Sequence, residues 1–267
     1  MRIVDSVEMI EEYFRPKLPT IWCPGCAHGI VTKALVKAVG ELGLDRTKTV
    51  LVSGIGCSSR TTGYLDFGTI HTTHGRALAF ATGIKLARPE LKVIVISGDG
   101  DASAIGGNHL IHAARRNIDL TLMVYQNGTY GMTGGQYSPT TETGMVTTTS
   151  ASGHLERPFD LCDLAKAAGA TYVARGTAYH FDMLWRLMVK AIEHKGFSFM
   201  EAMSSCPTYA GRLNSMESGT EALIAMREQA VLPGGSVSRA DQYPIGVLHQ
   251  SSAPEWYDVY RSLMPNR

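Results

Sequence analysis

Four cysteines stand at positions that could hold a metal centre. Cys23 and Cys26 are separated by two residues, whereas Cys57 and Cys206 are single and distant from them. Thiolates bind zinc or iron–sulfur clusters, and structural zinc sites tend to use two compact cysteine pairs. With only one compact pair, the spacing favours an iron–sulfur cluster; a zinc site and unligated core cysteines are the alternatives. The fifth cysteine, Cys162, has leucines on either side and is predicted to be a core thiol.

A second group of residues suits a magnesium diphosphate. Asp99 follows a β-branched run at 92–97 and lies between Gly98 and Gly100, while Asn127 ends the next predicted strand. Open parallel sheets bind ligands outside the carboxyl ends of their strands, and glycines let a ligand approach the backbone. A helix that begins after Asp99 presents free amides to phosphate oxygens. Because Mg²⁺ prefers oxygen ligands, these residues predict a magnesium site at this edge of the sheet.

The two groups together favour a thiamine-diphosphate enzyme that passes electrons to a cluster. A Gly-Asp-Gly turn alone is a weak sign, but Asn127 and the run Tyr-Gly-Met-Thr-Gly-Gly-Gln at 130–136 strengthen it. A zinc-stabilised binding module would explain the cysteines but not Asp99 and Asn127, and it is the alternative from another functional class. A simple thiamine decarboxylase would explain Asp99 and Asn127 but not the cysteines.

Strands and helices alternate along most of the chain, which is typical of an α/β fold with a doubly wound, mainly parallel sheet. The predicted strands are 49–53, 92–97, 120–126, 171–175 and 198–202, and the predicted helices are 28–42, 74–88, 102–116, 159–168, 180–194 and 217–229. Residues 128–155 form a long Gly-, Thr- and Ser-rich loop, and loops of this length are usually functional. We expect a cofactor-binding domain over 1–210, whose first twenty residues form an extended arm. A C-terminal extension over 211–267 is expected to pack on a partner subunit.

Composition narrows the functional class. The net charge of +1 over 267 residues gives no field that would attract nucleic acid or an anionic membrane. No run of 18 apolar residues is present, so no membrane span is expected. The charged fraction of 18% is low, and it favours large surfaces buried against partner subunits. Five cysteines and an acidic, not basic, N-terminal stretch lead us to expect a cytoplasmic protein.

Several motifs, in this order, resemble the thiamine-binding β subunits of 2-oxoacid:ferredoxin oxidoreductases. They lie at 22–26, 53–60, 73–77, 98–101, 105–109, 130–136, 138–140 and 206–208. The resemblance implies a thiamine-diphosphate-binding, pyrophosphate-type domain in an enzyme that decarboxylates a 2-oxoacid oxidatively, transfers the acyl group to coenzyme A and passes electrons to ferredoxin. It also implies an α subunit that carries the pyrimidine-binding half of the active site, in an (αβ)₂ heterotetramer.

The resemblance also assigns site residues. It implies that Cys23, Cys26, Cys57 and Cys206 hold one [4Fe-4S] cluster, and that Asp99, Asn127 and the backbone carbonyl of Thr129 hold Mg²⁺. The residues expected to line thiamine diphosphate are Ile55, Gly56, Cys57, Ser58, His74, Gly100, Asp101, Gly131 and Met132. Within the family the sequence is most similar to members that act on 2-oxoglutarate, which would give succinyl-CoA and CO₂ in a reaction reversible in principle. A branched-chain 2-oxoacid or pyruvate is the alternative substrate.

Two residues are candidates for direct catalytic contacts. The planar guanidinium of Arg60 suits a substrate carboxylate, and its alternative is a surface arginine or a structural ion pair. His74 begins a predicted helix, where it would contact cofactor or substrate, or else fix its loop by hydrogen bonds.

Gly134 stands where some relatives carry a lysine that meets the substrate carboxylate, and Ala27 replaces a glycine that is usual in the family. His109 and His112 share a helix face but have no third ligand nearby, so they are interpreted as core or partner-facing residues.

Overall fold

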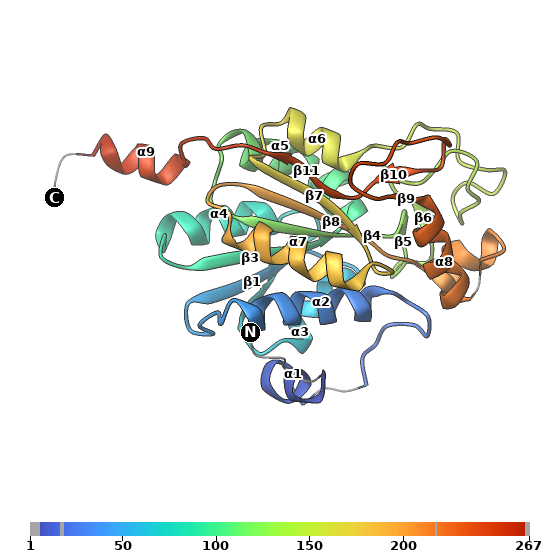
Figure 1. Ribbon diagram of the computed structural model, residues 1–267, viewed down its shortest axis with the longest axis horizontal. Coiled ribbons are helices and arrows are strands. Elements are labelled where there is room, and N and C mark those ends of the chain that lie inside the picture. Colours follow the sequence, from blue (N-terminus) through green and yellow to red (C-terminus); the bar gives the residue numbers. More distant parts are fainter. Residues whose placement is uncertain (1–5, 17–18, 217, 265–267) are drawn as a thin grey trace.

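A seven-stranded sheet forms the centre of the protein in a computed structural model that describes residues 6–16, 19–216 and 218–264 (Figure 1). The strands follow the order β11-β7-β8-β4-β3-β1-β2, and every neighbouring pair is parallel except β11 with β7. Their bounds are β1 Thr49–Ser53, β2 Gly68–His71, β3 Lys92–Gly98, β4 Thr121–Gln126, β7 Tyr172–Thr177, β8 Ser198–Met203 and β11 Gly246–Gln250. The predicted mainly parallel α/β fold is confirmed.

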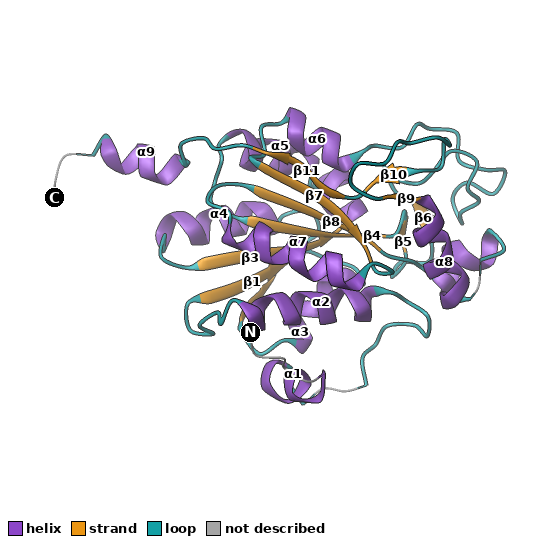
Figure 2. Cartoon of the chain, in the orientation of Figure 1, coloured by secondary structure: helices purple, strands orange, loops and turns teal. Residues whose placement is uncertain are grey.

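Helices cover both faces of the sheet (Figure 2). One face packs on α2 (His28–Glu41) and α7 (Phe181–Glu193), and the other on α4 (Ala77–Ala87), α5 (Gly107–Arg115) and α6 (Leu161–Ala167). Successive residues of a strand point to opposite faces, so Ile94 and Ile96 of β3 enter the first core and Val93 and Val95 enter the second. Both faces are therefore buried, which explains why these strands are continuous apolar runs without polar alternation.

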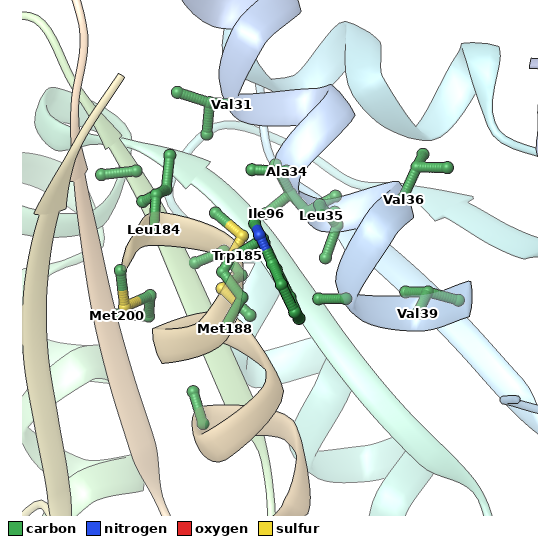
Figure 3. Close-up of a cluster of buried hydrophobic side chains, with 14 of the residues drawn as sticks. Val31, Ala34, Leu35, Val36, Val39, Ile96, Leu184, Trp185, Met188 and Met200 are labelled. Atoms are coloured by element: carbon green, nitrogen blue, oxygen red, sulfur yellow. The ribbon is translucent and has the colours of Figure 1, made fainter. Parts of the chain in front are cut away.

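The first core is centred on the packing of α2 against α7. In Figure 3, Leu35 of α2 and Ile96 of β3 lie close to Trp185 of α7, and Val39 of α2 and Met188 of α7 belong to the same cluster. These side chains are almost entirely buried. Apolar residues three and four apart on each helix supply this contact, as the periodicity predicts. The packing fixes the beginning of α2, which follows the first cysteine pair, relative to the sheet.

Short elements surround the carboxyl edge of the sheet. They are η1 (Ser58–Arg60), α3 (Thr61–Tyr64), the π-helical turns η2 (Asp101–Ile105) and η3 (Pro207–Gly211), and the hairpin β5 (Thr129–Tyr130) with β6 (Gln136–Tyr137). The helix predicted at 102–116 is thus split into η2 and α5. None of the helices in the described ranges has the length and apolar character that a membrane crossing needs.

The expectation of an extended N-terminal arm is wrong for residues 6–13, which form α1 (Ser6–Tyr13). Met9 and Tyr13, one helical turn apart, are buried, and the Tyr13 ring stacks on Phe67 with 6.0 Å between ring centroids. A helix of eight residues has little stability of its own, so contacts with distant residues decide its formation. The rest of the predicted arm lies partly outside the described residues.

The C-terminal segment contributes to the same domain. Besides β11, it forms α8 (Gly219–Gln229), the pair β9 (Ala230–Val231) and β10 (Tyr243–Pro244), and α9 (Trp256–Ser262). The start of α8 packs on the first cysteine turn so closely that a Cβ added at Gly219 would lie 2.7 Å from the Cα of Gly25. In contrast, α9 projects away from the sheet (Figure 1): it has no buried residue, and only Trp256 at its start packs, partly buried, against the second core. The segment 211–267 therefore both completes the sheet and ends in a projecting helix.

A buried ion pair joins β7 to β8, and its removal is predicted to destabilise the fold. Arg175 donates to Glu201 at 2.5 Å and to Asp160 at 2.7 Å, and Arg175 and Glu201 are both buried. Arg175→Met should lower the free energy of unfolding by about 3–5 kcal/mol, because it leaves the Glu201 carboxylate buried without its partner. Denaturant unfolding measures this change. The double variant Arg175→Met/Glu201→Met should recover much of the loss; equal losses in both variants would contradict the explanation.

A candidate cofactor site at the carboxyl edge of the sheet

The carboxyl ends of β1, β3 and β4 border one cavity of about 240 Å³. Residues at the ends of these strands meet there because parallel strands present their carboxyl ends at one edge. The cavity is lined by Ile55, Gly56, Cys57, Ser58, His74, Gly98, Asp99, Gly100, Asp101, Asn127, Thr129, Tyr130, Gly131 and Met132, with His28, Tyr125 and Thr133. The structure thus brings together every residue predicted to contact thiamine diphosphate or magnesium.

Asp99 is the buried carboxylate of this cavity. Its side chain accepts hydrogen bonds from Ser138 Oγ at 2.6 Å, Thr140 Oγ1 at 2.7 Å and the backbone N–H of Asn127 at 3.3 Å. Burial raises the pKa of the Asp99 carboxyl above its usual value, although the two hydroxyl donors oppose this shift. A desolvated carboxylate is stabilised by a bound cation. The long loop that carries Ser138 and Thr140 therefore serves to orient Asp99.

The oxygen atoms near Asp99 suit magnesium. The side-chain oxygen of Asn127 accepts the backbone N–H of Thr129 at 3.2 Å, which fixes the orientation of the amide. A carboxylate, an amide oxygen and a backbone carbonyl are hard oxygen ligands, and Mg²⁺ usually completes such a set with phosphate oxygens. The donor set of Asp99, Asn127 and Thr129 therefore fits a magnesium diphosphate.

The four predicted cluster cysteines gather beside this cavity. A Cβ added at Gly131 would lie 3.3 Å from the Sγ of Cys206 and 3.7 Å from the Sγ of Cys57, so these two sulfurs border Gly131. Burial raises the pKa of the Cys26 thiol to about 12, and the charges of Cys57, Cys206 and Cys23 add to the increase. Burial likewise raises the pKa of Cys57 to about 11, with Cys206 and Cys23 contributing. Trp22, next to Cys23, donates to the carbonyl of Cys57 at 2.8 Å, and a Cβ added at Gly25 would lie 3.6 Å from Pro207, so the turn of Cys23 and Cys26 lies beside the other two cysteines.

Within the described ranges, no three His, Cys, Asp or Glu side chains are grouped as ligands of one metal ion. Sulfurs on one zinc ion lie within about 4 Å of each other because each Zn–S bond is about 2.3 Å long. An iron–sulfur cluster instead distributes its thiolates over several iron atoms. The chemistry of the donor set, four thiolates from three separate segments, fits a cluster.

Comparisons with known proteins agree on one family. Residues 54–202 match the family described as thiamine pyrophosphate enzyme, C-terminal TPP binding domain. The 2-oxoacid:ferredoxin oxidoreductase 2, subunit beta, of Aeropyrum pernix is 35% identical over 253 residues, which cover 89% of this chain and 82% of that protein. This chain belongs to the 2-oxoacid:ferredoxin oxidoreductase β subunits.

Two further relatives are similar to the chain. The 2-oxoglutarate synthase subunit KorB of Archaeoglobus fulgidus is 61% identical over 199 residues, 74% of this chain and 74% of that protein. The structure of 2-oxoglutarate:ferredoxin oxidoreductase from Magnetococcus marinus, with 2-oxoglutarate, coenzyme A and succinyl-CoA bound, matches with a TM-score of 0.86 and 36% identity. The matched region covers 95% of this chain and 89% of the matched chain in that structure.

Two residues of this family member were missed by the sequence analysis. Trp22 donates from Nε1 to the carbonyl of Cys57 at 2.8 Å, so it ties the first cysteine turn to the second cysteine loop. His28 lines the cavity, is 1% exposed, and its Nδ1 has no hydrogen-bond partner among the described residues. Burial lowers its pKa to about 4, so the ring is neutral. The only sequence signal was its place at the start of a helix two residues after Cys26.

The remaining candidates lie at the margin of the cavity or away from it. Arg60 is exposed and its Nη2 approaches the Sδ of Met132 at 3.7 Å, which puts it at the rim. Cys162 is buried and donates to Glu201 at 3.3 Å, as expected for a core thiol. His112 accepts from Arg115 Nε at 3.0 Å on the outer side of α5. Cys162 and His112 are therefore not part of the candidate site.

Proposed function

We propose that this chain is the β subunit of a 2-oxoglutarate:ferredoxin oxidoreductase, which converts 2-oxoglutarate and coenzyme A to succinyl-CoA and CO₂. The observation that supports it most is the single cavity in which the oxygen set of Asp99 and Asn127 meets the loop of Cys57, one of four gathered cysteines. The relatives named for 2-oxoglutarate support the substrate, since three of them are 52–61% identical to this chain.

In the proposed site each residue has a defined task. Asp99, Asn127 and the Thr129 carbonyl would hold Mg²⁺ and thereby the diphosphate, while Cys23, Cys26, Cys57 and Cys206 would hold one [4Fe-4S] cluster. When bound, thiamine diphosphate supplies an electron sink for decarboxylation and the cluster accepts single electrons. Cys57 lines the cavity with its own loop, so the cluster would adjoin the cofactor and pass electrons outward to ferredoxin.

A partner subunit is needed to complete the site. The residues that line the cavity, all within the described part of the chain, include no glutamate to serve the pyrimidine ring. Ile55 and Met132 at the cavity and Ile105 on η2 are exposed apolar side chains that a partner would cover. We therefore propose an α subunit that supplies the pyrimidine-binding half, in an (αβ)₂ complex in the cytoplasm. The projecting α9, with Leu263 77% exposed, is proposed to pack on that partner.

Turnover by the complete complex tests the function. The chain is produced together with its α subunit, and reduction of a viologen dye or ferredoxin is followed with 2-oxoglutarate and coenzyme A. We expect a rate that depends on both substrates, yields succinyl-CoA and exceeds the rates with pyruvate and 2-oxoisovalerate. A preference for either of those acids would overturn the substrate assignment. A colourless zinc protein without turnover would favour the binding module instead.

Arg60 is predicted to bind the distal carboxylate of 2-oxoglutarate. Arg60→Met should raise KM for 2-oxoglutarate about 10–100-fold, because a charge-assisted hydrogen bond contributes about 1.5–3 kcal/mol. The KM for pyruvate, which lacks that carboxylate, should change less than about threefold. Arg60→Lys keeps the charge but not the planar fork, and it should give an intermediate value. Steady-state kinetics with both substrates measure the effect; equal changes for the two acids would assign Arg60 another role.

A further inference from the structure

The carboxylate of Asp101 is engaged by its own chain. Its Oδ1 accepts hydrogen bonds from His74 Nδ1 at 2.6 Å, Gly75 N at 2.7 Å and Ile55 N at 3.3 Å. Its Oδ2 accepts a hydrogen bond from Ser97 Oγ at 2.5 Å. A carboxylate has about four acceptor positions, about two on each oxygen, so Oδ1 is fully engaged and Oδ2 keeps about one position free. Asp101, predicted as a cofactor contact, therefore uses most of its hydrogen-bonding capacity within the protein.

The neighbouring backbone is shaped around this carboxylate. A Cβ added at Gly54 would lie 2.0 Å from Oδ2 of Asp101, so only glycine allows the carboxylate to reach this loop. Gly75, the second backbone donor, has a φ of +69°, a conformation that glycine adopts without strain. The Asp101 side chain, which is 3% exposed, is thus contacted by three segments: the loop after β1, the end of β3 and the turn before α4.

Of the two side chains that donate to Asp101, His74 and Ser97, His74 is the one that also lines the cavity. Its Nδ1 is directed at Asp101, its side chain is 38% exposed, and it lines the cavity together with Asp99 and Asn127. The edge of the ring contacts Tyr130 with 5.9 Å between ring centroids, which limits rotation. The hydrogen bond made by one imidazole nitrogen determines the protonation of the other. Asp101 therefore holds the ring through Nδ1, and Nε2 is the ring nitrogen left for a ligand in the cavity.

We propose that His74 exchanges a proton with the keto oxygen of the 2-oxoacid and that Asp101 is the positioning residue that fixes its orientation and tautomer. When a nucleophilic carbon adds to the keto carbon, the C=O π electrons move to oxygen, and that oxygen takes the proton from Nε2–H. The ring is then left with Nδ1–H bonded to Asp101. After CO₂ has left and two electrons have passed to the proposed cluster, the O–H proton returns to Nε2 as the C=O bond forms again. The thiol sulfur of coenzyme A then replaces the nucleophilic carbon, and the thiol proton passes to solvent. This inference rests on the proposed function.

The carboxylate–imidazole geometry makes this exchange effective. A carboxylate that accepts Nδ1–H stabilises the positive ring and prevents it from turning away, as in hydrolases that pair these two groups. A positioned acid or base contributes about 10²–10⁴-fold to a rate. Asp99 is not available for this task, because Ser138, Thr140 and Asn127 donate to it and the proposed magnesium would occupy it.

Four variants of the complete complex test the dyad: His74→Phe, Asp101→Asn, their double variant, and Ser97→Ala as a control that removes a different donor to Asp101. We expect His74→Phe and Asp101→Asn each to lower kcat at least about 100-fold. The double variant should be no slower than the slower single variant, since residues that act as a unit are not additive. Ser97→Ala should lose less than about fivefold. Iron content and the dissociation constant of thiamine diphosphate should stay within about twofold of wild type in all four.

Several results overturn the proposal. They are a His74→Phe variant that keeps a third or more of kcat, a double variant whose loss is the product of the two single losses, or a loss of cofactor binding that accounts for the lost rate. If Asp101→Asn does not fold, added imidazole with His74→Gly decides: restored turnover supports the proton exchange and no restoration overturns it. A wild-type complex that binds thiamine diphosphate but turns over no 2-oxoacid would instead refute the proposed function, which keeps the two failures distinct.

Discussion

Replacement of Asp99 by alanine is expected to abolish binding of thiamine diphosphate while leaving the iron content unchanged. Asp99 is the one charged oxygen ligand in the proposed magnesium set, and it is buried with three donors directed at it. Without the carboxylate, only the neutral oxygens of Asn127 and Thr129 remain as protein ligands of Mg²⁺, so the ion and the diphosphate are held less tightly. Mutation of a group that merely orients a metal ligand costs about 10–100-fold in affinity, so loss of the ligand itself should cost at least that much, and turnover at ordinary cofactor concentrations should disappear.

A matched control separates the carboxylate from its surroundings. Ser138→Ala removes one hydroxyl donor and leaves Asp99 in place, so it should weaken cofactor binding by about tenfold at most. Binding is measured by titration of the cofactor-free complex with thiamine diphosphate at fixed Mg²⁺, and iron is measured in the same samples. Cofactor retained by Asp99→Ala would remove Asp99 from the magnesium set. Iron lost together with the cofactor would mean that the substitution damages the fold.

The ends of the buried strands could be predicted from the sequence because they depend on local signals. Residues 93–96 are all apolar and β-branched, and the run 92–97 around them stops at the glycines that flank Asp99. Strand β3 accordingly ends at Gly98, and β4 ends at Gln126 just before Asn127. Since β3 and β4 are parallel neighbours with Gly98 beside Tyr125, local prediction of the two ends was enough to bring Asp99 and Asn127 to the same edge.

Features that depend on distant partners could not be predicted. Residues 246–250 form an edge strand only because β7 offers it an antiparallel partner about 70 residues earlier in the chain. Helix α1 depends on Phe67 in the same way. The inward orientation of Asp101 is set by donors at 55, 74 and 75, and no local pattern reveals them. Sequence motifs therefore identified which residues meet at the site. They did not show which side chains are engaged by hydrogen bonds within the protein and which are available to bind a ligand.

Replacement of Cys206 by serine is expected to remove the iron–sulfur cluster and with it all electron transfer to ferredoxin. The sulfur of Cys206 comes from the segment after β8, and that segment has no other cysteine that could replace it. A serine hydroxyl is a much weaker ligand for iron than a thiolate. The purified variant should lose most of its iron and its broad visible absorption, and 2-oxoglutarate-dependent dye reduction should fall at least about 100-fold.

The matched control for this prediction is Cys162→Ser. Cys162 lies in the second core and donates to Glu201, a role that a serine hydroxyl can also fulfil. This variant should keep its iron, colour and turnover, which would show that loss of a thiol is not in itself damaging.

Binding of thiamine diphosphate to Cys206→Ser is the informative second measurement. Because Cys57 lines the cofactor cavity and its sulfur and that of Cys206 border Gly131, loss of the cluster should loosen this loop and weaken cofactor binding. Cofactor affinity that is unchanged after complete loss of iron would mean that the two centres fold and bind independently.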